Sequence, residues 1–452
     1  MADLLDLSAR IIDSGVADVP VNRVTQELSE LRDNLAIVES FSHCTVLDTG
    51  DGLVAFDASA GNTGRAVVEQ IRRWRIHDVS HLMYTHGHLD HVGGSREFAA
   101  VWPNVNVVGH HNVARRFDRY AYTSDWNVEI NARQFGGIRA DKNLNVGPGT
   151  QDAADDLAPA DTDPRKWRSF LPIGTLRPTI EVGDEATFSI GTTRIDARHA
   201  RGETDDHLWY WLPDSRTIMS GDFLIWNFPN AGNPQKVQRY PGEWATALRS
   251  MAAAEPDLIV PAHGLPIAGT QRIQLVLNEV ATALEWLVAT VVGLMNDGAT
   301  LNTIIHEVTL PSDTLAKPYL RPLYDEPEFV IRNIWRMYGG WWDKAPSRLK
   351  PSRDETLASA IAALAGGPAS LMDAAQAAAD ANDLRLACHL ADFAGWAAPD
   401  DPEIHERRAA IYLVRRQHEP SLMSKGIFAA AARESQAIVD ASLGADTDEH
   451  KG

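Results

Sequence analysis

The stretch Thr85-His86-Gly87-His88-Leu89-Asp90-His91-Val92-Gly93-Gly94 decides how this chain is interpreted. It directly follows the apolar segment 79–84, which is typical of a buried strand. Side chains two positions apart on an extended chain lie on one side, so His86 and His88 are expected to face one ion. Asp90 and His91 can turn toward a second, neighbouring ion. Because imidazoles and carboxylates are ligands that zinc accepts, the stretch predicts a metal site.

Strands and helices alternate on both sides of this loop. Apolar alternation predicts strands at 34–39, 43–47, 53–56 and 105–108, and helical spacing predicts amphipathic helices at 63–74 and 95–101. Such alternation is typical of a layered α/β fold.

Three later strands each end near a further side chain that can bind metal. The strands are expected at 193–197, 217–219 and 258–260. Glu203 lies just past the first, and Asp222 and His263 close the other two. These residues therefore extend the predicted ligand set.

Residues 112–170 differ in character from the segments around them. They are polar and aromatic, with many Gly, Asn, Asp and Pro residues, and such long irregular segments often form lids or binding loops. Five aromatic side chains could form an apolar wall for the organic group of a substrate, although each could equally belong to the core. Three lie in this segment, Tyr120, Tyr122 and Trp126, and two lie after Asp222, Trp226 and Phe228.

Strand signals nearly vanish after residue 270. One long helix is expected at 273–296, and Ala- and Leu-rich helices are expected over 356–437. The sequence thus predicts a catalytic domain at 1–270, with its insert at about 112–170, and a helical domain at 271–443. Residues 444–452 are expected to form a disordered acidic tail.

Charge and composition exclude several classes of partner. The 452 residues include 42 Lys and Arg against 61 Asp and Glu, a formal charge of −19, which argues against nucleic acid or an anionic membrane surface as the partner. Cys44 and Cys388 offer no disulfide framework. The start of the sequence lacks the basic and apolar regions of a secretory signal, and no apolar run approaches the ~20 residues that a membrane span needs. We therefore expect a cytoplasmic protein.

Three motifs together resemble the metallo-β-lactamase superfamily over about residues 35–270: the opening stretch, Gly221-Asp222 after a strand, and His263-Gly264 after the last strand. The resemblance implies an αββα sandwich with a two-metal site at one edge. It implies His86 and His88 as ligands of the first ion and Asp90 and His91 as ligands of the second. It also implies Asp222 as the bridging carboxylate and His263 as the last histidine ligand.

One departure from the superfamily pattern points to a branch. Where the superfamily usually has H-x-x-G-H-T, this chain has His199-Ala-Arg-Gly-Glu203-Thr204. The expected ligand is therefore Glu203, a carboxylate similar to that of the alkyl sulfatase (type III sulfatase) branch. His199 would then support the site from outside the ligand set, and it is the alternative ligand.

The helical part resembles the same branch. Segments 318–324 and 331–343, the second reading Ile-Arg-Asn-Ile-Trp-Arg-Met-Tyr-Gly-Gly-Trp-Trp-Asp, are similar to the alkyl sulfatase dimerisation domain, which implies a homodimer. Alkyl sulfatases also hold the sulfate with an arginine soon after the bridging carboxylate, whereas this chain has no arginine there until Arg239. The candidate substitutes are Lys236, Arg239, Asn131 and Arg133.

The resemblance implies a dinuclear zinc hydrolase that converts a small anionic organic ester of the alkyl sulfate type to an alcohol and sulfate. Two Zn²⁺ ions per chain would supply a metal-bound hydroxide, with Asp90 and His91 as the catalytic residues; iron or manganese are alternatives. The missing arginine leaves open a metal-dependent lactone, carboxylic ester or phosphoester hydrolase on the same fold. A non-catalytic dimeric scaffold is a further alternative, but the intact ligands at every matched position argue against it.

Overall fold

The computed structural model describes residues 4–135 and 169–449, with side chains described up to residue 443. The chain divides into two compact units. The first comprises Met1–Glu129 and Arg139–Trp341, and the second comprises Ile130–Ile138 and Trp342–Gly452.

The first sheet of the first unit has seven strands that follow one another in chain order. They are β1 (Leu28–Arg32), β2 (Leu35–Val38), β3 (Cys44–Asp48), β4 (Leu53–Phe56), β5 (Val79–Met83), β6 (Asn106–His110) and β7 (Ile180–Val182). Strands β1 to β4 pair antiparallel, and β4 to β7 pair parallel. Parallel neighbours need crossover connections: α2 (Gly64–Trp74) connects β4 to β5, and α3 (Leu89–Val92) and α4 (Ser95–Val101) connect β5 to β6.

The second sheet has six strands in the order β13-β12-β11-β10-β9-β8. They are β8 (Glu185–Ile190), β9 (Thr193–His199), β10 (Leu208–Leu212), β11 (Thr217–Gly221), β12 (Leu258–Pro261) and β13 (Ile267–Ala268). Only β11 and β12 pair parallel, and α7 (Pro241–Ala253) connects them. The three strands that lead to predicted ligands, β9, β11 and β12, therefore lie in one sheet.

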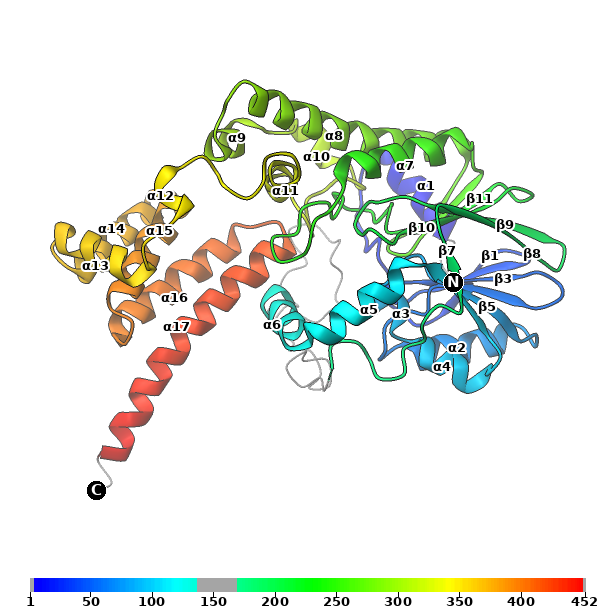
Figure 1. Cartoon of the computed structure of the whole chain (residues 1–452), viewed down its shortest axis with the longest axis horizontal. Helices are drawn as coiled ribbons and strands as arrows, with labels where there is room; N and C mark the ends of the chain where they lie inside the picture. The colour runs from blue at the N-terminus through cyan, green and yellow to red at the C-terminus, as the bar shows by residue number, and fades with distance from the viewer. Residues whose placement is uncertain (1–3, 136–168, 450–452) are drawn as a thin grey trace. The chain divides into compact units, whose positions relative to one another are not determined.

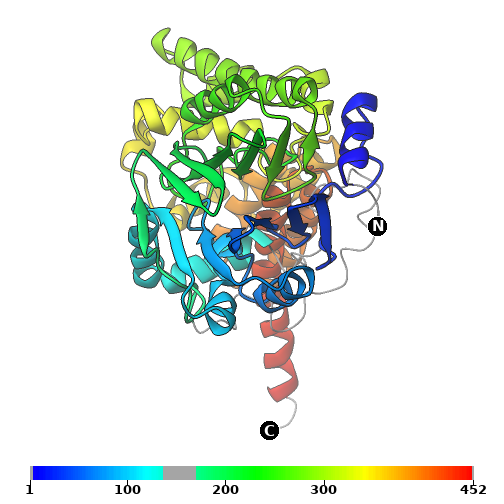
Figure 2. The ribbon, with the colours of Figure 1, turned by 90° about the vertical axis from the view of Figure 1, so that its right-hand side faces the viewer.

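Alternation along the central strands explains the layering. In β4, Val54 and Phe56 join the core that includes residues of both sheets, whereas Leu53 and Ala55 join the core that includes α2 and α4. Figures 1 and 2 show α2 and α4 over the outer face of the first sheet, and α7 with α8 (Thr270–Asn296) over the outer face of the second. The predicted αββα sandwich is confirmed.

The segment after the sandwich continues the first unit. Besides α8 it contains α9 (Leu301–Glu307), α10 (Ser312–Ala316) and α11 (Pro327–Gly339), and at the other end of the unit α1 (Leu4–Ser14) precedes the first sheet. Buried residues of α8, α9 and α11 share one core with the two sheets. The first compact unit thus extends to residue 341. The boundary at residue 270 between a catalytic and a helical domain stays a prediction.

Helix α8 corrects one expectation from the sequence. By length and composition it is the single helix among the described residues that could cross a membrane, with a mean hydropathy of 1.6. The bent pair α13 (Asp354–Ala365) and α14 (Pro368–Asp380) passes the same test as one segment. Its only charged residues are Arg272, Glu279 and Glu285. The apolar face of α8, including Ile273, Leu277 and Leu284, is fully buried in the core of the first unit.

The second unit is helical, as the sequence predicts. It contains α12 (Pro346–Leu349), α13 (Asp354–Ala365), α14 (Pro368–Asp380), α15 (Leu384–Ala397), α16 (Pro402–Gln417) and α17 (Leu422–Glu449). The breaks fall near the Gly-Pro and Asp-rich stretches that end helices. Helix α17 continues to Glu449, so the tail expected to be disordered from residue 444 is helical over 444–449, and no proline interrupts it there.

The sequence predicts an irregular segment at 112–170, and this prediction is wrong for residues 112–135. Residues 112–135 form α5 (Asn112–Tyr122) and α6 (Ser124–Phe135), because apolar residues recur at helical spacing in α5 and no proline or glycine interrupts either helix. Residues 136–168 of that segment lie outside the described residues. Strands β1, β7 and β13 are short and were not predicted.

Candidate metal centre

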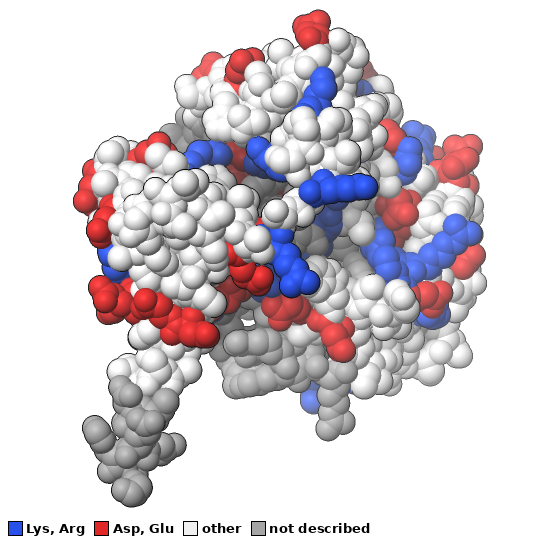
Figure 3. Space-filling view, turned by 60° about the vertical axis from the view of Figure 1, so that its left-hand side comes forward, with Lys and Arg blue, Asp and Glu red and all other residues white. Residues whose placement is uncertain are grey.

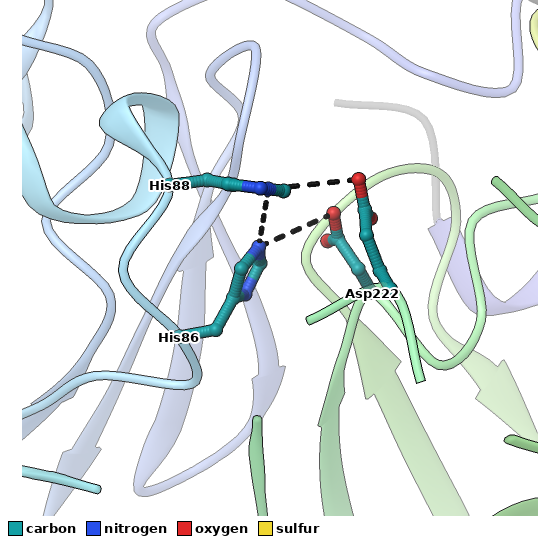
Figure 4. A group of neighbouring side chains, drawn as sticks. His86, His88 and Asp222 are labelled. Carbon is teal, nitrogen blue, oxygen red and sulfur yellow. Dashed lines mark hydrogen bonds and ion pairs between the residues drawn. The ribbon is translucent and has the colours of Figure 1, made fainter. Parts of the chain in front are cut away.

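The histidine loop follows β5 and presents two imidazoles to one point. His86 Nε2 lies 2.9 Å from His88 Nδ1. Asp222, directly after β11, has Oδ2 3.8 Å from His86 Nε2, and Glu203 Oε1 lies 3.5 Å from His88 Nδ1. Figure 4 shows His86, His88 and Asp222 pointing toward one another from two different segments of the chain. These four residues form one group that could hold a metal ion.

A second group lies beside the first. It consists of Asp90 and His91 in α3 and of His263 after β12. His91 Nε2 lies 3.5 Å and His263 Nε2 3.2 Å from Asp90 Oδ2. Asp222 Oδ1 lies 3.4 Å from His91 Nε2 and 3.6 Å from His263 Nε2. One oxygen of Asp222 therefore faces each group, which is the arrangement expected of a bridging carboxylate.

The polar atoms of the site fit metal ions. His91 Nε2 and Asp222 Oδ1 are buried and have no hydrogen-bond partner among the described residues. Burying such atoms without partners costs free energy, and native proteins rarely leave them so. Imidazole nitrogen and carboxylate oxygen are donors that zinc and related ions accept. The structure thus brings together all seven residues predicted as ligands, in two groups; that they bind metal stays a prediction.

The second ring nitrogen of three of these histidines is already engaged. His86 Nδ1 lies 3.1 Å from Thr85 Oγ1, His91 Nδ1 2.8 Å from Asp57 Oδ2, and His263 Nδ1 2.6 Å from the carbonyl oxygen of Phe41. These contacts turn each Nε2 toward the carboxylates and fix the orientation of the ring, as in metal sites where an outer partner orients the histidine ligand.

Asp57 is a supporting residue that the sequence reasoning did not identify. It follows β4, is fully buried, and accepts hydrogen bonds from the backbone N–H and the hydroxyl of Thr85, each at 2.7 Å. Its backbone has φ +59°, a conformation that non-glycine residues rarely adopt. The only signal in the sequence is an acidic residue at the end of an apolar strand.

Asp206 and Arg116 hold the middle of the histidine loop. Asp206 Oδ2 accepts hydrogen bonds from the backbone N–H of Gly87 at 3.1 Å and from Arg116 Nε in α5 at 2.7 Å. Both side chains are buried, and Arg116 also pairs with Asp205. The sequence reasoning missed this pair because its members are ninety residues apart.

His207 completes the back of the site. Its ring stacks on that of His86, with centroids 4.7 Å apart, and its Nε2 accepts a hydrogen bond from the backbone N–H of Asp222 at 3.1 Å. Gly221 has φ +54°, and a Cβ there would lie 2.6 Å from His207 Cε1. Glycine is therefore required directly before the bridging carboxylate.

His199, the alternative ligand, lies outside both groups. Its Nε2 is 3.1 Å from the carbonyl oxygen of Asp205, and its ring stacks on His110 at 4.0 Å between centroids. The structure places Glu203, not His199, with His86 and His88.

Burial and neighbouring charges set the protonation of the ligands. Burial, together with the nearby His91 and His88, holds the pKa of His86 well below its usual value, so the ring is neutral and can donate a lone pair. Burial opposes ionisation of Asp222, but His91 and His263 keep its pKa low. Burial raises the pKa of Glu203 to about 8, although Arg239 opposes that rise. A metal ion would favour the charged carboxylate.

Arg239 is in the site, and its contact is with Glu203. The guanidinium is buried, with Nη1 2.5 Å from Glu203 Oε1 and 2.9 Å from the carbonyl oxygen of Asn230. Its Nε has no hydrogen-bond partner among the described residues. Burial, followed by the charge of Arg239, lowers the pKa of Lys236 to about 7. Lys236 Nζ lies 6.0 Å from the centre of the Phe170 ring, which also contacts the ring of Tyr120.

The other predicted substrate residues are scattered. Tyr122 and Trp126 are exposed to 91% and 60%, so neither forms a buried wall. Trp226 and Phe228 are fully buried core residues, and the indole N–H of Trp226 donates to the carbonyl oxygen of Leu265 at 2.7 Å. Asn131 and Arg133 lie in the part of α6 that belongs to the second unit, and their role stays a prediction.

Two family models match the chain. The model of the metallo-beta-lactamase superfamily matches residues 37–263, and the model named alkyl sulfatase dimerisation matches residues 300–437.

Curated relatives and solved structures agree with these matches. A linear primary-alkylsulfatase from a Pseudomonas strain is 24% identical over 368 residues, covering 79% of this chain and 67% of that protein. An (R)-specific secondary-alkylsulfatase from Pseudomonas is 21% identical over 379 residues, covering 81% of this chain and 56% of that protein. The structure of the stereoselective inverting sec-alkylsulfatase Pisa1 from Pseudomonas superposes with a TM-score of 0.76 at 18% identity, over 90% of this chain and 65% of that one, and so shares its fold.

Proposed function

This chain belongs to the metallo-beta-lactamase superfamily, and on that premise we propose that it is a metal-dependent hydrolase of organic sulfate esters with two zinc ions per chain. Both Pseudomonas relatives are alkylsulfatases, and the second family model carries the name of that group. The chain spans 56% to 67% of the length of these relatives. The proposed activity therefore rests on the site residues of this chain itself.

The observation that carries the proposal is the position of Asp222 between two groups of ligands. His86, His88 and Glu203 would hold one ion with Asp222, and Asp90, His91 and His263 would hold the other. Bound metal ions supply an activated water near neutral pH and stabilise negative charge that develops on the ester. Asp90, besides its role as ligand, can accept a hydrogen bond from that water and orient it toward the ester.

The positive charge that a sulfate ester needs comes from the site. Figure 3 shows acidic and basic side chains interspersed on the face it draws, and the whole chain carries a formal charge of −19. In the site, Arg239 has a buried Nε that lacks a hydrogen-bond partner among the described residues, and Lys236 lies in the same loop. A sulfate oxygen would give that Nε the acceptor it lacks.

A second candidate is a lactone, carboxylic ester or phosphoester hydrolase that uses the same metal ligands. The observation in its favour is that Arg239 Nη1 is engaged with Glu203 and Asn230. A guanidinium held in this way offers fewer donors to the sulfate group than a free arginine does.

The test combines metal analysis with a substrate panel on one sample. The protein is purified with its native metal, and metal per chain is measured by elemental analysis. The panel contains primary and secondary alkyl sulfates, an aryl sulfate, lactones, carboxylic esters and phosphoesters. We expect about two zinc ions per chain and sulfate release that a chelator abolishes. Activity on the other esters alone would replace the proposal with the second candidate.

Two variants connect any activity to the site. His88→Ala removes one ligand, and we expect it to abolish turnover while the circular dichroism spectrum is retained. His81→Ala, a histidine of β5 that belongs to neither ligand group, is the matched control and should keep activity. Equal activity in the two variants would overturn the assignment of the site.

The remaining expectations are part of the same proposal. The substrate is a small anionic organic ester, and the family model over residues 300–437 supports a homodimer. We place the protein in the cytoplasm, with no nucleic acid or membrane as partner, as the formal charge of −19 favours. Light scattering of the purified protein tests the dimer.

A further inference from the structure

The loop between Asp222 and α7 brings Arg239 to the site, but it has little regular structure of its own. Residues 222–240 contain no strand or helix, and Arg239 is nevertheless 2% exposed and paired with Glu203. A buried arginine at the end of an irregular loop needs fixed backbone contacts to stay in place. Those contacts come from the segment 325–333, which is more than eighty residues further along the chain.

Asn333 of α11 closes this loop with a single amide group. Its Nδ2 donates to the carbonyl oxygen of Ala231 at 3.0 Å and to that of Arg239 at 2.8 Å. Its Oδ1 accepts from Gln238 Nε2 at 3.0 Å and lies 3.4 Å from the backbone N–H of Arg239. Asn333 is 4% exposed. The same side chain therefore holds both ends of the segment 231–239.

Asp325, just before α11, holds the start of the same segment. Its Oδ2 accepts from the backbone N–H groups of Gly232 at 2.6 Å and Asn233 at 3.1 Å, and the side chain is fully buried. A Cβ on Gly232 would lie 2.4 Å from the carbonyl carbon of Phe329, so the loop and helix backbones are in close contact. Three independent features thus fix residues 231–239 against α11.

From this geometry we infer that Asn333 and Asp325 are positioning residues of the candidate active site, which act by holding Arg239 against Glu203. The inference rests on the proposed function. It also gives the region matched by the dimerisation model a role in the site, because Asn333 lies within residues 300–437 and Arg239 within the loop that follows Asp222. Substrate binding should then depend on α11.

A double-mutant cycle with Asn333→Ala and Arg239→Met tests the functional part. Asn333→Ala should raise KM for the sulfate ester about tenfold or more, with a smaller change in kcat and an unchanged zinc content, because it removes no metal ligand. If Asn333 acts through Arg239, the double variant should have the KM of Arg239→Met alone. If the increases in KM of the two single variants instead multiply in the double variant, the inference is overturned. Arg332, an exposed residue of α11 that pairs with Glu328, provides the control, and Arg332→Ala should keep the wild-type KM.

Amide hydrogen exchange tests the structural part without any activity. Asn333→Ala should speed exchange at residues 231–239, and Arg332→Ala should not. Unchanged exchange in Asn333→Ala would overturn the inference even if the enzyme is a sulfatase. Faster exchange in a protein that hydrolyses no sulfate ester would refute the proposed function and leave the positioning of Arg239 intact.

Discussion

Asp222 and the histidines around it show how single atoms determine the candidate metal centre. The ring nitrogens that face away from the centre are bonded to Thr85, Asp57 and the backbone of Phe41, and the opposite nitrogens converge on carboxylates. In each of these imidazoles one nitrogen is bonded to a supporting group and the other faces the carboxylates. This arrangement distinguishes a ligand from a histidine that is merely buried. It provides two predictions at the scale of the residue.

The first prediction concerns the choice between Glu203 and His199 as ligand. Glu203→Gln keeps the volume of the side chain and an acceptor for Arg239 but removes the charge. We expect it to lower metal affinity by about tenfold or more, because a neutral amide is a poor ligand. His199→Ala removes one hydrogen bond to Asp205 and should leave metal content unchanged. Competition with a zinc-sensitive dye measures both, and a loss of metal in His199→Ala alone would reverse the assignment.

The second prediction concerns the carboxylate that orients His91. Asp57→Asn replaces one acceptor oxygen with a donor, so the bond to His91 Nδ1 and those from Thr85 cannot all be kept. Loss of such a partner typically weakens metal binding by about 10- to 100-fold. Titration of the metal-free protein should show this decrease, while the exposed control Asp51→Asn should bind as the wild type does. Equal affinities would exclude Asp57 from the support of the site.

Asp325 gives a third prediction, on the pH dependence of stability. Burial raises its pKa from 3.8 to about 6, so the folded protein binds a proton more tightly than the unfolded chain. The stabilisation by that proton is fully present below pH 3.8 and is lost as the pH rises through 6. The loss amounts to at most about 3 kcal/mol. Urea unfolding of the wild type and Asp325→Asn should show a stability difference that changes in this direction between pH 4 and pH 7. A constant difference would contradict the prediction.

Residue types and spacing predicted the seven candidate ligands because six of them stand in short motifs at the ends of apolar strands and Glu203 lies just past another strand. Asp206 and His207 have no such signal, and Asp57 has only its position at the end of an apolar strand. Their contacts include residues 28, 119 and 15 positions away along the chain, and only the fold brings such residues together. The partner of Arg239 was unpredictable for the same reason.

At the scale of the element, the histidine loop is held between β5 and α5. Arg116 of α5 and Asp206 form a buried ion pair that also fixes the backbone N–H of Gly87. Breaking a buried pair by removing one partner leaves an unpaired charge, which costs about 3–5 kcal/mol. We expect Arg116→Met to lower the free energy of unfolding by that amount in urea titrations. Arg115→Met, on the same helix, should cost less than about 0.5 kcal/mol. A small loss in Arg116→Met would mean that another group supports Asp206.

Elements with a clear apolar period were predictable from the sequence, and short or polar elements were not. The strands of the sheet centres and α8 are mostly apolar, whereas β1 has only two apolar residues among five, and β7 and β13 have three and two residues. Helices α5 and α6 were missed because their aromatic and polar composition suggested an irregular loop. In α5 that composition hides a helical period, in which Val113, Phe117 and Tyr120 are buried.

At the scale of the whole molecule, the candidate metal centre draws its residues from both sheets of the sandwich. The first group takes ligands from the loop after β5 in one sheet and from the strand ends of the other, and the second group does the same. Bound metal should therefore stabilise the association of the two sheets as well as the site. Ions that bind the folded chain alone raise stability in proportion to the logarithm of their concentration over Kd.

The last prediction follows from this coupling. Removal of metal leaves Asp222 close to two further carboxylates, Asp90 and Glu203; the charge of Asp90 disfavours that of Asp222, and the charge of Asp222 disfavours that of Glu203. We expect the metal-free protein to melt about 4 °C or more below the loaded protein, which corresponds to a loss of about 4 kcal/mol for a chain of 452 residues. Differential scanning calorimetry with and without a chelator measures the shift, and added zinc should restore it. The variant His88→Ala should show a smaller shift, because it binds less metal. Identical melting temperatures with and without the chelator would mean that metal does not link the two sheets.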